Sequence, residues 1–180
     1  MDETVDGFDG APIAHPKLRA LHDFWHRCRG EGALPRRSAI PAEQFKPWMG
    51  HMMILEPVGE TAAALPRFRV RLHGTRLYGY DGKDLTGWFI DDVVGEPGLS
   101  CIVAPYAAAV NARAPQYDVI QSPFPGGTVH HLCRLVLPCA EDGHQVDRLL
   151  VGMYLHAQPR HDPPPHTVPP DAAAGHGGYA

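Results

Sequence analysis

Twelve histidines among 180 residues invite a test for acid–base or metal chemistry. His22 and His26 stand four residues apart in a segment of helical periodicity, which is the spacing of two metal ligands on one helix face. The sequence offers no third ligand beside them, so a solvent or interface contact is the better interpretation. His130 and His131 are neighbours on an expected strand and point to opposite faces, so at most one could reach a pocket. We expect no metal site.

Nucleophilic catalysis has little support in the sequence. The chain contains no G-x-S-x-G, no phosphate-binding P-loop and no G-x-G-x-x-G. Its cysteines show no C-x-x-C spacing and are expected to be reduced thiols packed as small hydrophobic groups; they are Cys28, Cys101, Cys133 and Cys139. Cys101 near a helix start is a weak candidate for a stabilised thiolate. We therefore expect no enzyme, and the rival hypothesis is a small enzyme that uses His73, His131 or a cysteine.

Charge and hydropathy exclude other classes of protein. The chain has 16 basic and 20 acidic residues, and the acidic excess precedes the first basic residue, Lys17. Without a basic excess, we expect binding neither to nucleic acid nor to an anionic membrane surface. The longest strongly apolar run, 149–155, is far shorter than the ~20 residues that cross a bilayer. Because residues 1–14 lack the basic and apolar regions of a secretory signal, we expect a cytoplasmic protein without membrane insertion.

The first element that could position such side chains is a helix over about His15 to Arg29, with Pro16 in its first turn and Gly30 after its end. Apolar residues recur in it at spacings of three and four and form one stripe. This stripe must pack on a sheet of the same chain or on a second subunit. Its expected interface residues are Leu18, Leu21 and Trp25.

Five strands are expected, at Met52–Val58, Phe68–His73, Gln116–Gln121, Thr128–Leu137 and Val146–His156. Apolar and polar residues alternate through all six positions of Phe68–His73, which predicts a strand with one buried and one solvent-exposed face. Glycines within 74–92 predict short helical turns. A helix within 97–113 is expected to begin near Ala104 and Pro105, with the proline in its first turn. The result is an α+β domain: a five-stranded antiparallel sheet with helices inserted between its second and third strands.

Three segments follow from this pattern: a disordered acidic N-terminus over 1–14, the folded domain over 15–156 and a disordered tail over 157–180. The tail has six prolines and three glycines in 24 residues and almost no large apolar side chain, so it cannot offset its ordering entropy. Within the domain, Asp84 and Thr86 beside Gly87 are expected to form a turn. Arg36 and Arg37, among prolines, are expected to tie a linker to the same fold.

Five short motifs, in this order, are similar to those of a known family: Trp25 in the first helix, Leu34–Arg37 with Ile40 and Pro41, Phe68–Leu72 running into Gly74 and Thr75, Gly82–Gly87, and Arg134–Pro138. The chain resembles a PAS domain. Its motifs are similar in particular to those of a bacterial family of stand-alone PAS proteins. The resemblance implies a sensory or signalling module that holds a small molecule between sheet and helices or docks a separate partner protein. Its signal would pass through the N-terminal helix or a homodimer interface.

The resemblance also bears on cofactors and on the pocket. Haem-binding PAS domains often carry a histidine on the helix before the last three strands, and 97–113 has none; a flavin photosensor would need a cysteine before residue 97 in the short helices, where there is none. The cofactor is left unknown. Alternatives are an interaction domain with a filled core and a haem sensor that uses His73 or His131. The expected pocket residues are Leu77, Tyr78, Trp88, Phe89, Tyr106, Val110, Cys133 and Met153.

Overall fold

The computed structural model describes residues 12–30, 32–59, 66–95, 98–123 and 129–156. The acidic N-terminal segment expected over 1–14 therefore lies mostly outside the described residues, and the tail expected over 157–180 lies wholly outside them. The three-segment division of the chain stays a prediction.

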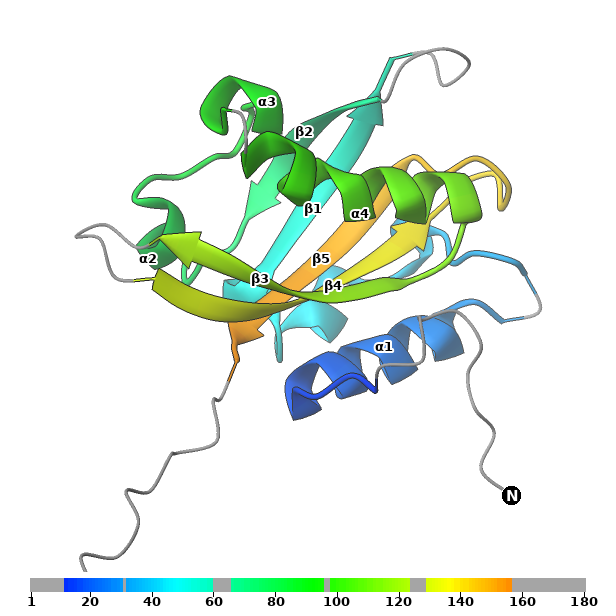
Figure 1. Ribbon diagram of the computed structural model, residues 1–180. Coiled ribbons are helices and arrows are strands. Elements are labelled where there is room, and N and C mark those ends of the chain that lie inside the picture. Colours follow the sequence, from blue (N-terminus) through cyan, green and yellow to red (C-terminus); the bar gives the residue numbers. More distant parts are fainter. Residues whose placement is uncertain (1–11, 31, 60–65, 96–97, 124–128, 157–180) are drawn as a thin grey trace, which may run out of the picture.

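The sheet has five antiparallel strands in the order β2-β1-β5-β4-β3, which confirms the expected α+β class. The strands are β1 (Met52–Val58), β2 (Arg67–His73), β3 (Gln116–Pro123), β4 (Val129–Cys139) and β5 (Arg148–Leu155). The last three strands in the sequence form a meander, in which Arg134 of β4 pairs with Met153 of β5 and Asp118 of β3. β1 joins β5, so the first two strands of the chain complete the sheet (Figure 1).

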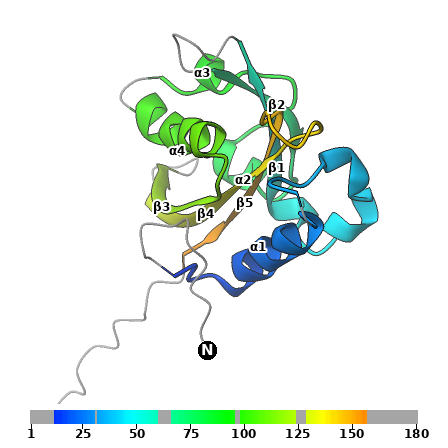
Figure 2. The same cartoon turned by 90° about the vertical axis from the view of Figure 1, so that its right-hand side faces the viewer.

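Helices cover both faces of this sheet, as the apolar residues on both faces of β5 require. The inserted helices α2 (Tyr78–Asp81), α3 (Ile90–Val93) and α4 (Gly98–Ala112) lie on one face, and α1 (Pro16–Cys28) lies on the other (Figures 1 and 2). Within the described ranges, no helix is long and apolar enough to span a membrane.

The apolar stripe of α1 packs against β4 and β5 of its own sheet. Leu18 and Leu21 are fully buried over Gly152, where a Cβ atom would come within 2.7 and 2.9 Å of their Cδ2 atoms. Trp25 is 2% exposed, and its indole N–H donates to the carbonyl oxygen of Pro138 at 2.8 Å. These three predicted interface residues therefore face the chain's own sheet. A second copy could contact them only after α1 had left the sheet, and their role in an interface stays a prediction.

The segment between α1 and β1 consists of three 3₁₀ turns, η1 (Arg37–Ala39), η2 (Ala42–Phe45) and η3 (Met49–His51). Arg37 donates to the carbonyl of Ile40 at 3.0 Å and lies over the ring of Phe45, as expected for a linker arginine. Trp48 donates from its indole N–H to the carbonyl of Lys17 at 2.8 Å. Arg37 thus orders the linker itself, and Trp48 ties the linker to the first turn of α1.

Helix α4 differs from its expected form. It begins at Gly98 and contains Pro105 in its interior, whereas the sequence predicted a start at the proline. A proline in mid-helix leaves the carbonyl four residues earlier without a donor, which normally breaks the helix. Here Arg134 of β4 donates to that carbonyl, on Cys101, at 3.3 Å. Tertiary structure therefore permits a helix that local propensity disfavours.

Candidate functional site

A cavity of about 60 Å³ lies between the sheet and the inserted helices. The sheet contributes Met53, Leu132 and Met153, and the helical side contributes Leu85, Ile90 and Tyr106; Tyr80 and Asp81 of α2 add polar atoms. A water molecule occupies about 30 Å³ of the liquid, so this space corresponds to roughly two waters. Ordinary ligand pockets measure about 300–1,000 Å³. In this conformation the core is nearly filled.

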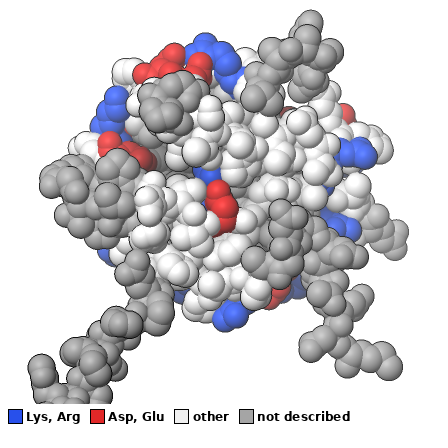
Figure 3. Space-filling model, in the orientation of Figure 1, with Lys and Arg blue, Asp and Glu red and all other residues white. Residues whose placement is uncertain are grey.

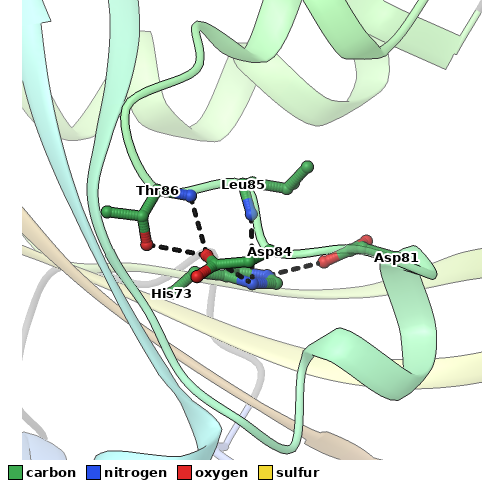
Figure 4. A network of polar contacts seen from close by, with 5 residues as sticks. All are labelled: His73, Asp81, Asp84, Leu85 and Thr86. Carbon is green, nitrogen blue, oxygen red and sulfur yellow. Dashed lines mark hydrogen bonds and ion pairs between the residues drawn. The ribbon is translucent and has the colours of Figure 1, made fainter.

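Asp81 forms a polar corner of this cavity and is paired with His73 behind it (Figure 4). The His73 side chain is 1% exposed, and its Nε2 lies 2.9 Å from Oδ2 of Asp81. The backbone N–H of Leu85 donates to Nδ1 at 3.5 Å. This places the proton on Nε2, from which it is donated to Asp81. Both ring nitrogens of His73 are therefore engaged.

The loop that follows is held by an Asx turn. Asp84 accepts hydrogen bonds from the backbone N–H and the hydroxyl of Thr86, at 2.9 and 2.7 Å (Figure 4). These bonds favour the charged carboxylate, and they lower the pKa of Asp84. The expected turn at Asp84 and Thr86 is thus confirmed, and it positions Leu85 toward the cavity.

A β-bulge brings His73 to this corner, which the sequence pattern did not predict. Strict alternation along β2 would put His73 on the solvent-exposed face of the strand, with Arg69 and Arg71. In the structure Leu55 pairs with Val70 and Ile54 with Leu72, so the register shifts between them. The extra residue reverses the facing of the last two positions of β2. His73 therefore lies on the same face as Phe68 and Val70, inside the fold.

Arg134 is the buried charge of the site. Its Nε and Nη2 donate to the two carboxylate oxygens of Asp118 at 2.9 and 2.6 Å, and its Nη1 donates to the carbonyl of Ile102 at 2.8 Å. The guanidinium lies 5.0 Å from the ring centre of Tyr106. Burial opposes the charge, but Tyr106 and Asp118 outweigh it and raise the pKa of Arg134. The Arg134–Asp118 pair joins β4, β3 and α4 behind the cavity.

The structure brings two of the eight predicted pocket residues to the cavity, Tyr106 and Met153. Leu77 is buried but does not line it, and Tyr78 and Trp88 are 52% and 48% exposed. Whether any of these residues contacts a ligand stays a prediction.

The other three predicted residues lie farther away. Phe89 lies beneath the guanidinium groups of Arg67 and Arg69. Val110 lines an open depression at the other end of α4. Cys133 lies on the opposite face of β4 from Leu132, with its sulfur 3.2 Å from Nδ1 of His156.

Strand pairing explains which cavity residues the sequence analysis missed. Arg134 pairs with Met153, so the inward residues of β4 are Leu132 and Arg134, whereas Cys133 is directed toward α1. Alternation alone reveals two faces of a strand but not which face is inward. Met53, Leu85 and Ile90 carry no chemical signal, because apolar residues of this kind usually form the core.

The residues present do not fit a haem or a flavin in this cavity. A space of about 60 Å³ is far too small for either group. His73 has no free ring nitrogen, and His131 lies on the face of β4 turned away from the cavity, since it is one residue from Leu132. Among the described residues, no three histidine, cysteine or acidic side chains are grouped as metal ligands.

The sequence of the chain matches a family model described as a PAS domain over residues 13–154. Most of the chain lies within this match, so the chain belongs to the PAS domain family. Members of this family are generally sensory and signalling modules rather than catalysts. No curated protein matches the chain.

Solved structures of similar fold include a PAS domain of BvgS from Bordetella pertussis, 13% identical, covering 78% of this chain and 88% of the other, with a TM-score of 0.46. The light-state LOV domain of the blue-light photoreceptor Aureochrome1 is 8% identical, covering 66% and 91%, with a TM-score of 0.45. An RNA-binding light-oxygen-voltage receptor is 10% identical, covering 67% and 35%, with a TM-score of 0.44. The family assignment rests on the sequence match. That this chain binds no nucleic acid stays a prediction from its charge.

Proposed function

We propose that this chain is a cytoplasmic sensory module that responds to a small molecule in its core cavity, or to a docked partner protein, and signals through α1. The observation that supports this proposal is the alternation of β5. Met153 lines the cavity on one face, and Gly152 contacts Leu18 and Leu21 of α1 on the other. Adjacent residues of β5 therefore lie against the cavity on one face of the sheet and against α1 on the other.

The small size of the cavity gives the proposal a mechanism. A ligand shifts a conformational equilibrium only when it binds the two states unequally. Any organic molecule larger than about 60 Å³ must displace the cavity wall, so it binds only a conformation in which helices or strands have moved. Displacement of β5 changes the surface on which α1 packs. A released α1 would expose Trp25 and its neighbours to a separate partner or to a second copy of the chain.

A second candidate function is a protein-interaction domain with a filled core, and the same small cavity favours it. In that case no ligand enters, and the exposed surface of the chain carries the function. A catalytic role for His73 or His131 has less support, because His73 is engaged at both nitrogens and His131 lies away from the cavity.

Native mass spectrometry and an absorption spectrum of the purified chain distinguish the two candidates. A retained organic molecule that leaves on mild denaturation supports the sensory module. A bare protein mass, with no stabilisation by any member of a panel of metabolites, supports the filled-core domain.

The path to α1 is tested separately by hydrogen exchange. Met153→Ala enlarges the cavity. Relative to the parent chain, we expect hydrogen exchange to accelerate more in α1 than in β1, whose exchange reports global opening. Leu155→Ala is the matched control, since Leu155 lies on the same strand and is 48% exposed. Equal exchange of α1 in both variants would reject the path.

A further inference from the structure

A second and larger hollow lies outside the core cavity, between β2, α3 and the first half of α4. Its volume is about 360 Å³. We call it the β2–α4 groove and define it by its apolar lining, which comprises Pro66, Phe68, Ile90, Leu99, Val103 and Ala104. Its volume falls in the range of ordinary small-molecule sites, about 300–1,000 Å³, whereas the core cavity falls well below it.

Three polar residues, Arg67, Asp91 and Ser100, also line the groove, and the charges at this end are paired with one another. Arg67 donates from Nε to Oδ2 of Asp91 and from Nη2 to Oδ1 of Asp92, both at 2.7 Å. Its guanidinium also lies over the ring of Phe89, 4.0 Å from the ring centroid. Figure 3 shows acidic and basic side chains together at the α3 end and an almost uncharged surface over α4. An ionic ligand would find no unpaired charge among Arg67, Asp91 and Asp92.

The composition of α4 also favours an uncharged ligand over an ionic one. From Gly98 to Ala112 the helix contains no charged residue, although several of its side chains are exposed. Surface helices normally carry charged residues on their solvent side. An uncharged helix beside an apolar hollow permits close approach of a neutral molecule without desolvating a charge.

We propose that the β2–α4 groove binds an uncharged, apolar organic molecule of about the size of a two-ring aromatic compound. An apolar cavity of about 150 Å³ holds benzene, and the groove is more than twice as large. Because the rim charges are already paired, an ionic ligand gains no new ion pair with them, and the apolar lining supplies the binding energy. The groove is distinct from the core cavity, so this site does not depend on the function proposed above.

The groove and the core are in direct contact through shared and neighbouring side chains. Ile90 lines both the groove and the core cavity. Phe68, which is 1% exposed, meets the ring of Tyr106 edge-on at 5.4 Å between centroids. A molecule in the groove therefore contacts two side chains that also form the wall of the core. This contact gives the groove a physical means of influencing the same packing.

The test uses N-phenyl-1-naphthylamine, a neutral fluorescent probe, with the full chain. We expect saturable binding and a rise in fluorescence. Ala104→Trp fills the groove from an exposed position, and we expect it to weaken binding by about tenfold or more. Ala112→Trp makes the same change on the same helix beyond the groove and should keep the affinity within about twofold. Circular dichroism melting confirms that both variants fold, and Ala104→Met provides a milder filling if the tryptophan variant does not.

Competition defines the ligand class. Naphthalene should displace the probe, and 1-naphthoate, its carboxylate analogue, should compete about tenfold more weakly or worse. The proposal is overturned if no saturable binding occurs, if Ala104→Trp and Ala112→Trp bind alike, or if the carboxylate competes as well as the neutral compound. A probe that binds here while α1 exchange is insensitive to Met153→Ala would retain this site and reject only the proposed signalling path.

Discussion

Arg134 satisfies the backbone carbonyl that Pro105 leaves without a helical donor. Pro105 has no N–H, so the carbonyl of Cys101 lacks its usual hydrogen bond within α4. Nη2 of Arg134 lies 3.3 Å from that oxygen, and Nη1 lies 2.8 Å from the carbonyl oxygen of Ile102. A side chain of β4 thus replaces a backbone donor of the helix. This contact predicts that the proline and the arginine are energetically coupled, although they stand 29 positions apart.

A double-mutant cycle tests this link. Arg134→Met should lower the free energy of unfolding by about 3 kcal/mol, because it breaks a buried pair and leaves buried acceptors unsatisfied. In the background of Pro105→Ala, the restored backbone N–H can donate to Cys101, so the same change should cost about 1 kcal/mol less. Urea unfolding of the four proteins measures both values. Strictly additive effects would mean that Arg134 does not compensate for the proline.

Gly152 tests the docking of α1. A side chain at this position enters the space of Leu18 and Leu21, whose Cδ2 atoms would lie 2.7 and 2.9 Å from a Cβ atom. Gly152→Val should therefore displace α1, cost about 1–3 kcal/mol by overpacking, and accelerate hydrogen exchange in α1 more than in α4. Gly95→Val is the control, because a Cβ there meets no atom within 4 Å. Similar exchange of α1 in both variants would contradict this arrangement.

Trp25 tests whether α1 is also an interface. Trp25→Glu places a charge in a site that is 2% exposed and removes the hydrogen bond to Pro138. We expect a loss of about 3–5 kcal/mol, typical of large buried side chains, together with release of α1. Light scattering after gel filtration then reports whether the molecular mass changes. Unchanged mass and unchanged stability together would show that Trp25 serves neither docking nor association.

The elements that the sequence predicted well are those whose signals are local. Met52–Val58 was expected as a strand and is found with the same bounds. The helix over about His15 to Arg29 is found at Pro16–Cys28, since its proline and its apolar stripe lie within the segment and Gly30 follows directly after it. The order of strands and helices then sufficed for the α+β class and the sheet.

What the sequence could not reveal depends on contacts between distant segments. The bulge that buries His73 is defined by pairing with β1, and six alternating residues give no sign of it. Pro105 lies inside a helix, and Arg134 of β4 donates to the Cys101 carbonyl that the proline leaves without a donor. The inward face of β4 follows from its register with β5, which placed Cys133 toward α1 and Leu132 in the cavity. Local pattern predicts an element, whereas its register and its facing are tertiary properties.

A stack of three rings joins the start of α1 to the sheet. Tyr154 of β5 lies between His15 and His51, with ring centroids 4.4 and 4.2 Å away. Burial lowers the pKa of His15, and His51, Arg19 and Lys17 lower it further. Burial also lowers the pKa of His51, and Arg76 contributes to this shift, which a backbone hydrogen bond with Met153 opposes. Protonation would thus place two positive charges on opposite faces of one tyrosine.

The pKa shifts predict the direction of the pH dependence. Because the folded pKa of both histidines lies below the ordinary 6.5, the unfolded chain binds protons more readily, and stability is fully present above pH 6.5 and lost as the pH falls below it. The variant His15→Asn with His51→Asn removes both titrations. Asparagine can replace the cap of α1 that His15 provides, in which Nδ1 accepts from the backbone N–H of Lys17 at 3.2 Å. Urea unfolding at about pH 7.5 and about pH 5.5 should show a smaller loss of stability in this variant than in the parent, whereas His144→Asn in an exposed turn should leave the loss unchanged. An equal loss in the parent and the double variant would assign the acid sensitivity to other groups, of which His22, also lowered in pKa by burial, is the first to test.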